Sequence, residues 1–314
     1  MDALYKKILE KQHYHFIGEH TAVKLCGWTK NSITGKGTCY KQKFYGINSH
    51  QCAQMSPAVN FCNHDCVFCW RERNNSEFDQ IDDPKIIADK IEEGQWALIN
   101  GYGGNPLTDM KKLTEAKKVK HVAISLNGET MAYPKIGELV TELKTKGKST
   151  FLVTNGTFPH KLREMAEKNQ LPTQIYVSVE APTKELYIKI DRPIYEDTWF
   201  KLMEFLDVMK EIKHKTRTVM RITLVKGINM VEPEGFSKLV ERAEPKFLEI
   251  KGYSFVGASK QRLEPENSPK YSEVTEFAEQ IGKHCDYKYI DGSEPSRVVL
   301  YMKEDTPDRI MQFD

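Results

Sequence analysis

The amino-acid sequence lacks long hydrophobic runs, because no stretch approaches the roughly 18 apolar residues that a membrane-spanning helix requires. Its first ten residues mix charged and apolar side chains, whereas a secretory signal contains a continuous apolar segment. Internal repeats, low-complexity segments and Gly/Ser-rich or Pro-rich linkers are also absent. We therefore expect one compact, soluble, cytoplasmic body with no membrane association.

A strong charge of either sign is missing as well. The chain has 46 basic and 44 acidic residues, which leaves a net charge of +2, and its pI is near 8.0. Nucleic-acid-binding domains usually carry a larger basic excess. The lysine-rich segments 111–120 and 210–217 are therefore interpreted as solvated helix faces, with a local nucleic-acid surface as the alternative.

The seven cysteines do not have the pattern of a disulfide framework. Their number is odd, and six of them lie in the first 69 residues. Small secreted domains instead carry even sets of cysteines that pair with one another. Ligation of a metal or an iron–sulfur cluster accounts better for this local grouping.

The most specific motif is Cys62-Asn-His-Asp-Cys66-Val-Phe-Cys69, which has CxxxCxxC spacing. Three thiolates from one short loop can ligate three irons of a cubane [4Fe–4S] cluster and leave the fourth iron free to bind a ligand. The alternative is a zinc site completed by His64 or Cys52, although structural zinc sites favour two separated ligand pairs. An iron with a free coordination site predicts a catalytic rather than a structural role for the cluster.

From Pro57 onward, short β-rich runs alternate with amphipathic segments, which indicates an α/β fold with βα units and a parallel sheet. Apolar residues recur at helical spacing in 136–143, 197–213 and 274–281, with Gly147 as a stop signal after the first. The expected strands are Ala58–Phe61, Val122–Leu126, Thr150–Thr154, Ile175–Val179, Val219–Val225 and Phe247–Ile250, with later candidates at Tyr287–Ile290 and Val298–Tyr301.

The cysteine loop, with the aromatic Phe68 directly before Cys69, resembles the signature of the radical S-adenosylmethionine (radical SAM) enzymes. The resemblance implies a partial (βα)6 barrel whose first strand precedes the loop, an iron that chelates S-adenosyl-L-methionine, and packing of Phe68 on the adenine. With this fold, the chain divides into an N-terminal cluster-binding extension at 1–56, a barrel at 57–290, and a C-terminal strand and tail at 291–314. The cofactor would supply a 5′-deoxyadenosyl radical that abstracts hydrogen from an unactivated carbon.

The same resemblance assigns residues to the cofactor. They follow the second, third and fourth expected strands, and ligands collect at the carboxyl ends of parallel strands. Thr130 stands where many relatives have proline, and the Asn-Gly pairs have an alternative interpretation as ordinary turns. The assigned residues are Asn127, Gly128 and Glu129 for the methionine amino group, Ser178 and Glu180 for the ribose and methionine ends, and Asn155 at the same rim.

Cys26, Cys39 and Cys52 form a second triplet with Cx12Cx12C spacing. If each merely packed as a small hydrophobe, the grouping would be accidental, so we expect a second [4Fe–4S] cluster with an open iron. This triplet, the loop and the segment 251–257 resemble the tRNA 4-demethylwyosine synthases, and the resemblance covers nearly the whole chain. Members of that family condense N1-methylguanosine-37 of tRNA(Phe) with a two-carbon unit of pyruvate.

The reaction implies further residues and partners. Lys41, two residues after Cys39, is placed to form a Schiff base with pyruvate if its pKa is lowered, with Lys43 as the fallback and the second cluster as another holder of pyruvate. We expect an external electron donor of the flavodoxin or ferredoxin type, and a monomer. Two alternatives stay open, namely a radical SAM enzyme that acts on a peptide or protein with an auxiliary cluster, and a noncatalytic zinc-stabilised RNA-binding protein.

Overall fold

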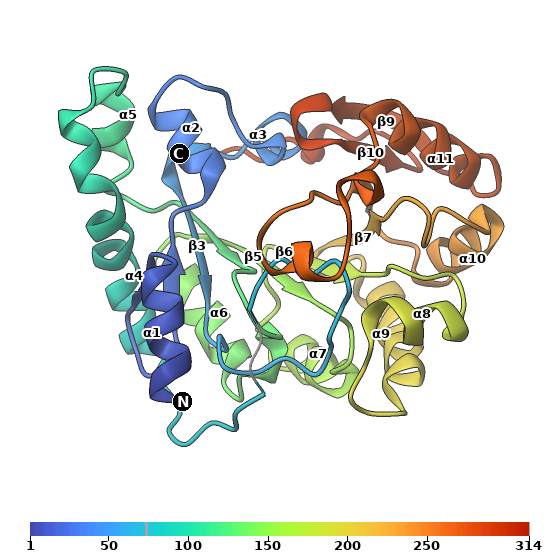
Figure 1. Ribbon diagram of the computed structural model, residues 1–314, viewed down its shortest axis with the longest axis horizontal. Helices are drawn as coiled ribbons and strands as arrows, with labels where there is room; N and C mark the ends of the chain where they lie inside the picture. The colour runs from blue at the N-terminus through green and yellow to red at the C-terminus, as the bar shows by residue number, and fades with distance from the viewer. Residues whose placement is uncertain (73–74, 314) are drawn as a thin grey trace.

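The computed structural model describes residues 1–72 and 75–313, in which ten strands form one continuous sheet (Figure 1). Six consecutive strands run parallel in the order of the sequence, as expected for repeated βα units. They are β3 (Cys52–Ser56), β4 (His121–Ile124), β5 (Ser149–Thr154), β6 (Gln174–Ser178), β7 (Arg217–Leu224) and β8 (Phe247–Gly252). The predicted α/β class and the partial (βα)6 barrel are confirmed.

Helices that connect these strands lie along the outer side of the sheet (Figure 1). The apolar stripe predicted for 136–143 is buried against it, and the chain turns after this helix at Gly147, whose φ is +70°. The helices are α4 (Pro84–Ile99), α5 (Met110–Glu115), α6 (Ile136–Thr145), α7 (Pro159–Glu167), α8 (Lys184–Asp191), α9 (Thr198–Ile212), α10 (Pro233–Ala243) and α11 (Tyr271–Lys283). None of the helices among the described residues is long and apolar enough to cross a membrane.

Antiparallel strands extend the sheet at both edges. β1 (Tyr14–Phe16) and β2 (Ala22–Lys24) precede β3, and β10 (Val298–Met302) pairs with β8 and then with β9 (Lys288–Ser293). Within the described residues β1 and β9 do not pair, so the barrel stays open. The division at residues 56 and 290 remains a prediction, and the sheet runs through both boundaries.

The first parallel strand lies earlier than predicted. The segment expected as a strand, Ala58–Phe61, is a loop with one isolated bridge at Phe61, and the strand is Cys52–Ser56. Cys52 and Gln54 alternate with buried Ala53 and Met55, so the strand lacks a continuous apolar signal. Ala58 and Val59 are apolar and fully buried in this loop, and Tyr5 donates a hydrogen bond to the Val59 carbonyl.

The C-terminal segment lies beside two N-terminal helices at one end of the barrel. In Figure 1, α2 (Gly27–Ile33) and α3 (Tyr40–Tyr45) lie near the C-terminal segment, whereas α1 (Ala3–Lys11) lies farther along the same side. The aromatic residues of α3 pack with Phe151, Tyr176 and Phe247 from the barrel strands. The Met311 amide donates to the Tyr45 carbonyl at 3.0 Å, so the tail supports α3 directly.

Candidate active site

The cysteine loop follows β3 at the carboxyl end of the parallel strands and is held from one side by the segment after β4. Gly128 has φ +68°, and a Cβ atom there would overlap the carbonyl oxygens of Ala58 and Phe61. The next amide, of Glu129, donates to the Phe61 carbonyl at 2.7 Å. Glycine is therefore required for the close approach of these two segments.

The segment after β8 holds the loop from the other side. Gly257 has φ +61°, and a Cβ atom would overlap the Trp70 carbonyl, which accepts a hydrogen bond from the Ala258 amide at 3.1 Å. Arg262 donates to the carbonyls of Val67 at 3.1 Å and Cys69 at 2.5 Å. The loop is thus fixed by residues almost 200 positions away in the sequence.

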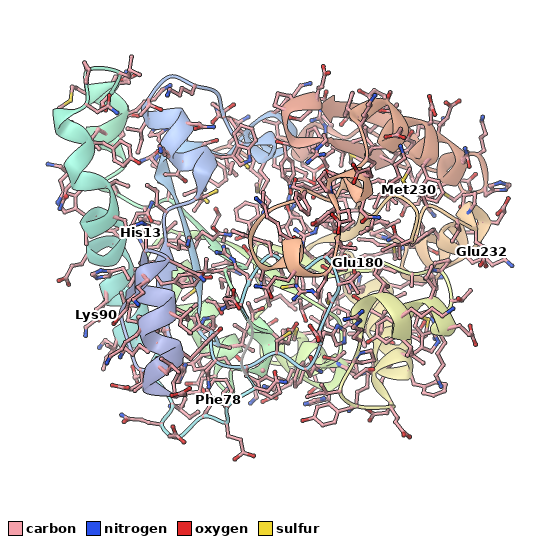
Figure 2. All side chains as sticks on the ribbon, in the orientation of Figure 1. His13, Phe78, Lys90, Glu180, Met230 and Glu232 are labelled. Carbon is pink, nitrogen blue, oxygen red and sulfur yellow. The ribbon has the colours of Figure 1, made fainter. Side chains whose placement is uncertain are left out.

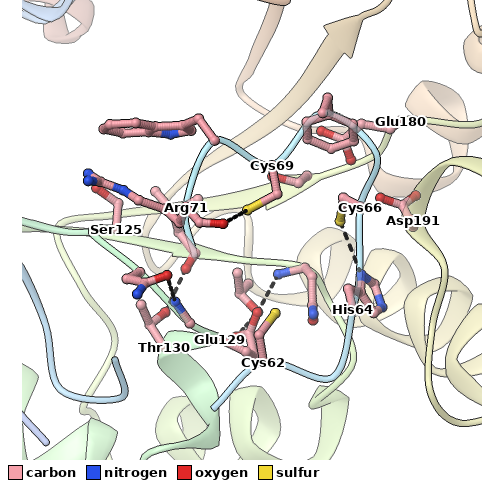
Figure 3. A pocket seen from close by; sticks show the side chains of 18 of the residues that line it. Cys62, His64, Cys66, Cys69, Arg71, Ser125, Glu129, Thr130, Glu180 and Asp191 are labelled. Atoms are coloured by element: carbon pink, nitrogen blue, oxygen red, sulfur yellow. Dashed lines mark hydrogen bonds between the residues drawn. The ribbon is translucent and has the colours of Figure 1, made fainter. Parts of the chain in front are cut away.

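The three loop thiols line a cavity of about 200 Å³, and their sulfur atoms point toward its centre (Figure 3). The structure brings every predicted cofactor-binding residue to this cavity, although their individual roles remain predictions. The lining includes Cys62, Cys66, Cys69, Phe68, Asn127, Gly128, Glu129, Asn155, Ser178 and Glu180.

The Glu129 carboxylate is hydrogen-bonded to the end of the neighbouring strand β5. Its carboxylate accepts hydrogen bonds from the Thr154 hydroxyl at 2.6 Å and from the amides of Asn155 at 2.8 Å and Met131 at 2.9 Å. Burial raises the pKa of its carboxyl. The Thr130 hydroxyl donates to the Val153 carbonyl at 2.6 Å, so a hydrogen bond restrains the backbone where many relatives have proline.

Glu180, in contrast, has an unused acceptor. The residue lies in the interior of the molecule (Figure 2) and is 3% exposed. Its Oε1 has no hydrogen-bond partner among the described residues, and burial raises its pKa well above the usual range. Since a buried acceptor without a partner is costly, the cavity fits a ligand that brings hydroxyl or ammonium donors, as S-adenosyl-L-methionine does.

Arg71 is a cavity residue that the sequence analysis missed. Its side chain stacks on Trp70 with 3.2 Å between the guanidinium carbon and the ring centre, and its Nε and Nη2 have no partner in the described structure. Only its position two residues after Cys69 could have drawn attention to it. Asp191 is a second missed residue, and its carboxylate lies with the ligand atoms of His64 and Cys66, all within 4.8 Å of one another.

Of the two residues proposed to complete a zinc site in the cysteine loop, only His64 lies near the loop cysteines. His64 lies beside Cys66, with 4.0 Å between Nδ1 and Sγ, while its Nε2 is 2.8 Å from the Tyr187 hydroxyl. Cys52, the other proposed zinc ligand, lies instead with Cys26 and Cys39.

The second cysteine triplet comes from three separate elements. Cys26 precedes α2, Cys39 precedes α3, and Cys52 begins β3. Burial, with the neighbouring Cys26 thiol as a lesser cause, raises the pKa of Cys39 to about 11 and of Cys52 to about 12. Thiolates in such a place need a cation beside them, so the set fits a metal or an iron–sulfur cluster.

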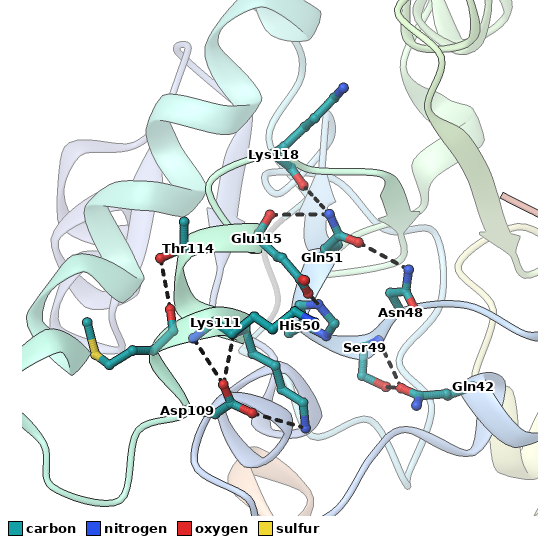
Figure 4. A network of polar contacts seen from close by, with 12 residues as sticks. Gln42, Asn48, Ser49, His50, Gln51, Asp109, Lys111, Thr114, Glu115 and Lys118 are labelled. Atoms are coloured by element: carbon teal, nitrogen blue, oxygen red, sulfur yellow. Dashed lines mark hydrogen bonds and ion pairs between the residues drawn. The ribbon is translucent and has the colours of Figure 1, made fainter. Parts of the chain in front are cut away.

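Polar contacts hold the segment between Cys39 and Cys52 in place (Figure 4). The Cys39 amide donates to the Ser49 hydroxyl at 2.9 Å, which in turn donates to the Gln42 side chain at 2.8 Å. Gln51 donates to the carbonyl of Glu115, in α5, at 3.2 Å. The triplet is therefore anchored to the barrel by the loop that joins its members.

Lys41 and Lys43 have opposite surroundings. The Lys41 ammonium lies 4.4 Å from the ring centre of Tyr176 and 5.0 Å from that of Phe151, both on barrel strands. The side chain of Lys43 is 55% exposed and pairs with Asp291 at 2.6 Å. Lys41 thus lies against rings of two barrel strands, whereas Lys43 pairs with the edge strand β9, and the choice between the two lysines remains a prediction.

Three further residues near Lys41 were missed, although two of them occupy alternate positions of one strand. Glu249 and Lys251 belong to β8, and Arg221 belongs to the neighbouring β7. Glu249 is fully buried and accepts hydrogen bonds from the hydroxyls of Tyr40 at 2.9 Å and Tyr45 at 2.6 Å. Burial lowers the pKa of Lys251. Charged residues in an otherwise apolar strand were the available sequence signal.

Known proteins match the chain over nearly its full length. The sequence model of the Radical SAM superfamily matches residues 56–240, and that of wyosine base formation matches residues 242–303. The S-adenosyl-L-methionine-dependent tRNA 4-demethylwyosine synthase of Pyrococcus abyssi is 48% identical over 303 residues, which cover 95% of this chain and 88% of that protein. The synthase of Methanocaldococcus jannaschii is 39% identical and covers 95% of both chains.

A structural comparison agrees with the sequence comparison. The structure of TYW1 with a lysine-pyruvate adduct bound superposes with a TM-score of 0.89 at 36% identity and covers 99% of both chains. Together with the match to the superfamily, this likeness accounts for the six-stranded barrel and the cysteine loop. The chain therefore belongs to the radical SAM superfamily and, within it, to the S-adenosyl-L-methionine-dependent tRNA 4-demethylwyosine synthases.

Proposed function

We propose that the protein condenses N1-methylguanosine-37 of tRNA(Phe) with a two-carbon unit of pyruvate to form 4-demethylwyosine. The observation that carries the proposal is the position of Lys41, whose ammonium lies inside the barrel over Tyr176 and beside the second cysteine triplet. A lysine-pyruvate adduct is bound in a solved relative that covers 99% of this chain. The relatives' names and the wyosine region at 242–303 support the same reaction.

Two [4Fe–4S] clusters and S-adenosyl-L-methionine fit the residues present. Cys62, Cys66 and Cys69 would hold one cluster, and Cys26, Cys39 and Cys52 the other. When bound, the cofactor and its cluster would supply the radical chemistry needed to activate the N1-methyl group. Phe68, Asn127, Gly128, Asn155, Ser178 and Glu180 would bind the cofactor, and Glu129 would position the strand ends around it.

Lys41 would act as the nucleophile toward pyruvate. Its amine attacks the carbonyl carbon, the new C–N bond forms, and the carbonyl oxygen leaves as water, so that pyruvate is held as an imine. The rings of Phe151 and Tyr176 cover the nitrogen and stabilise a positive charge on it. Pyruvate then contributes two carbons to the new ring and loses its carboxyl carbon.

The remaining partners follow from this chemistry. The methylated base would leave the anticodon loop and enter the open side of the barrel. An external flavodoxin- or ferredoxin-type protein would deliver electrons to the monomer. We place the reaction in the cytoplasm, since its relatives modify tRNA and reduced thiols persist there.

The decisive experiment is anaerobic incubation of the purified protein with cofactor, reductant, pyruvate and N1-methylated tRNA, followed by mass analysis of the nucleosides. We expect 4-demethylwyosine, and none when pyruvate or the methyl group is omitted. Lys41→Ala should abolish the product while Lys43→Ala retains it. Cofactor cleavage without this product would instead favour a peptide substrate, and colourless protein with stoichiometric zinc and no iron would contradict both radical enzymes.

A further inference from the structure

Three cationic side chains lie near the rings of Tyr40 and Tyr176. The Lys41 ammonium lies 4.4 Å from the Tyr176 ring centre, the Arg221 guanidinium 5.8 Å from the same ring, and the Lys251 ammonium 5.4 Å from the Tyr40 ring. Tyr40 and Tyr176 belong to one buried cluster. Lys251 lies two positions after Glu249 on β8 and shares its face of the sheet.

These cations outnumber the carboxylates that face them in the described part of the chain. None of the three forms an ion pair there, and Lys251 makes no side-chain hydrogen bond. Glu249 faces both Arg221 and Lys251, and each of its oxygens also accepts a hydrogen bond from a tyrosine hydroxyl. Cationic side chains removed from bulk water without enough opposite charge are costly, so the group is suited to a further anion.

We propose that Lys251 binds the carboxylate of pyruvate while Lys41 holds its carbonyl carbon. This inference rests on the proposed function. In the imine, the carboxylate is bonded to the same carbon that bears the Lys41 nitrogen, so it must lie close to that nitrogen. Lys251 is a neighbouring cation with a free ammonium, and it approaches from β8 while Lys41 approaches from α3.

The assignment makes Lys251 the residue that selects a keto acid over a neutral ketone. A hydrogen bond between charged groups contributes enough binding free energy to change an affinity by about 10- to 100-fold. Acetone offers the same carbonyl chemistry to Lys41 but no carboxylate. The wild-type protein should therefore trap pyruvate at lower concentrations than acetone by about this factor.

The test is reductive trapping of the imine in the anaerobically purified holoprotein. Cyanoborohydride reduces the imine to a stable amine, and peptide mapping by mass spectrometry locates it. We expect the adduct on Lys41. Lys251→Met should raise the half-saturating pyruvate concentration by about 10- to 100-fold and leave acetone trapping unchanged, while Lys251→Arg restores most of the affinity. Iron content and the affinity for S-adenosyl-L-methionine should stay at wild-type values.

The matched control is Lys43→Met, because that lysine is on the same helix but pairs with Asp291 outside the barrel. Wild-type pyruvate saturation in Lys251→Met, an adduct on Lys251, or an equal loss of acetone trapping would each overturn the inference. If Lys251→Met loses its clusters, the comparison of acetone with pyruvate in the wild-type protein takes its place. Equal trapping of the two compounds by the wild-type protein would contradict the inference. Intact trapping without 4-demethylwyosine contradicts the proposed function alone.

Discussion

Gly128 shows how one residue can decide whether the cysteine loop forms. Gly128→Ala would place a Cβ atom against the Ala58 and Phe61 carbonyls at a backbone φ of +68°. We expect a loss of at least about 3 kcal/mol of stability or displacement of the loop. Iron analysis should show less iron than in wild type, together with lost cofactor cleavage.

The control for this substitution is Gly101→Ala, because nothing lies within 4 Å of a Cβ atom there and the residue is exposed. Its iron content and midpoint of thermal unfolding should match those of the wild type. An active Gly128→Ala variant with full iron would show that the two segments can separate without loss of the cluster.

His121 should make the stability depend on pH. Burial lowers its pKa from 6.5 to about 3, its Nε2 accepts from the Asn48 amide, and its Nδ1 is 2.8 Å from the Ser149 hydroxyl. As the pH falls, His121 therefore binds a proton in the unfolded chain before it does so in the folded protein. The stabilising effect is complete well above pH 6.5, and about 2 kcal/mol of it is lost by pH 5.

Thermal unfolding between pH 7 and pH 5 checks this effect. His121→Gln keeps an acceptor and a donor but does not titrate, so its unfolding midpoint should fall less over this range than that of the wild type. The exposed His160→Gln variant serves as the control and should retain the wild-type pH dependence. Identical slopes in all three proteins would contradict the role of His121.

Local spacing revealed both cysteine triplets, because their pattern lies within short stretches of sequence, whereas Lys41 was proposed from the resemblance to a known family. The surroundings of these residues could not be read in the same way. Arg71 lies in a cavity that distant segments of the chain complete, and the hydrogen-bond donors to Glu249 lie more than 200 positions away, on α3. A side chain whose significance depends on such distant contacts leaves no periodic signal.

At the scale of elements, α3 positions both Cys39 and Lys41 through a buried hydrogen-bonded link to β8. Glu249→Gln would remove the charged acceptor from both tyrosine hydroxyls and leave one of them facing an amide NH2 that cannot accept, at a cost of about 1–3 kcal/mol. We expect a reduced yield of the Lys41 adduct and lower occupancy of the second triplet. Cofactor cleavage at the first cysteine loop should persist, which iron analysis and product analysis together can show.

A matched variant separates the link from the packing around it. Tyr45→Phe removes one donor and keeps the ring that packs on Phe247. It should weaken adduct formation in the same direction as Glu249→Gln. Full adduct yield in both variants would mean that packing alone positions α3.

The later strands could be predicted to within about two residues, because buried parallel strands are continuous apolar runs. β3 could not, since its half-buried Cys52 and Gln54 interrupt such a run. The predicted Ala58–Phe61 strand had the apolar composition of a buried loop instead. Polar residues at a functional site thus removed the signal at the strand that begins the barrel.

At the scale of the whole molecule, the C-terminal tail stabilises an N-terminal element. Arg309 donates to the Phe44 carbonyl at 3.0 Å, and Met311 donates to the Tyr45 carbonyl. Deletion of residues 304–314 should lower the midpoint of thermal unfolding and the iron held by the second triplet. Iron at the first loop should remain, because that loop is held by Gly257 and Arg262.

Lys36→Ala is a suitable control, since this exposed residue lies between Cys26 and Cys39 in the chain and its side chain forms no hydrogen bond or ion pair in the described structure. It should keep the full iron content. A truncated protein with all of its iron and an unchanged unfolding midpoint would show that the tail only covers α3.

The distance along the chain between α3 and its supports also sets an order of events. Tyr40 and Glu249 are 209 residues apart, and Phe44 and Arg309 are 265 apart. At about 5–20 residues per second, a ribosome needs on the order of 10–50 seconds to make the missing part. All six cysteines of the loop and the second triplet are thus synthesised long before the residues that secure α3, so the surroundings of the second triplet form only after those residues have been made.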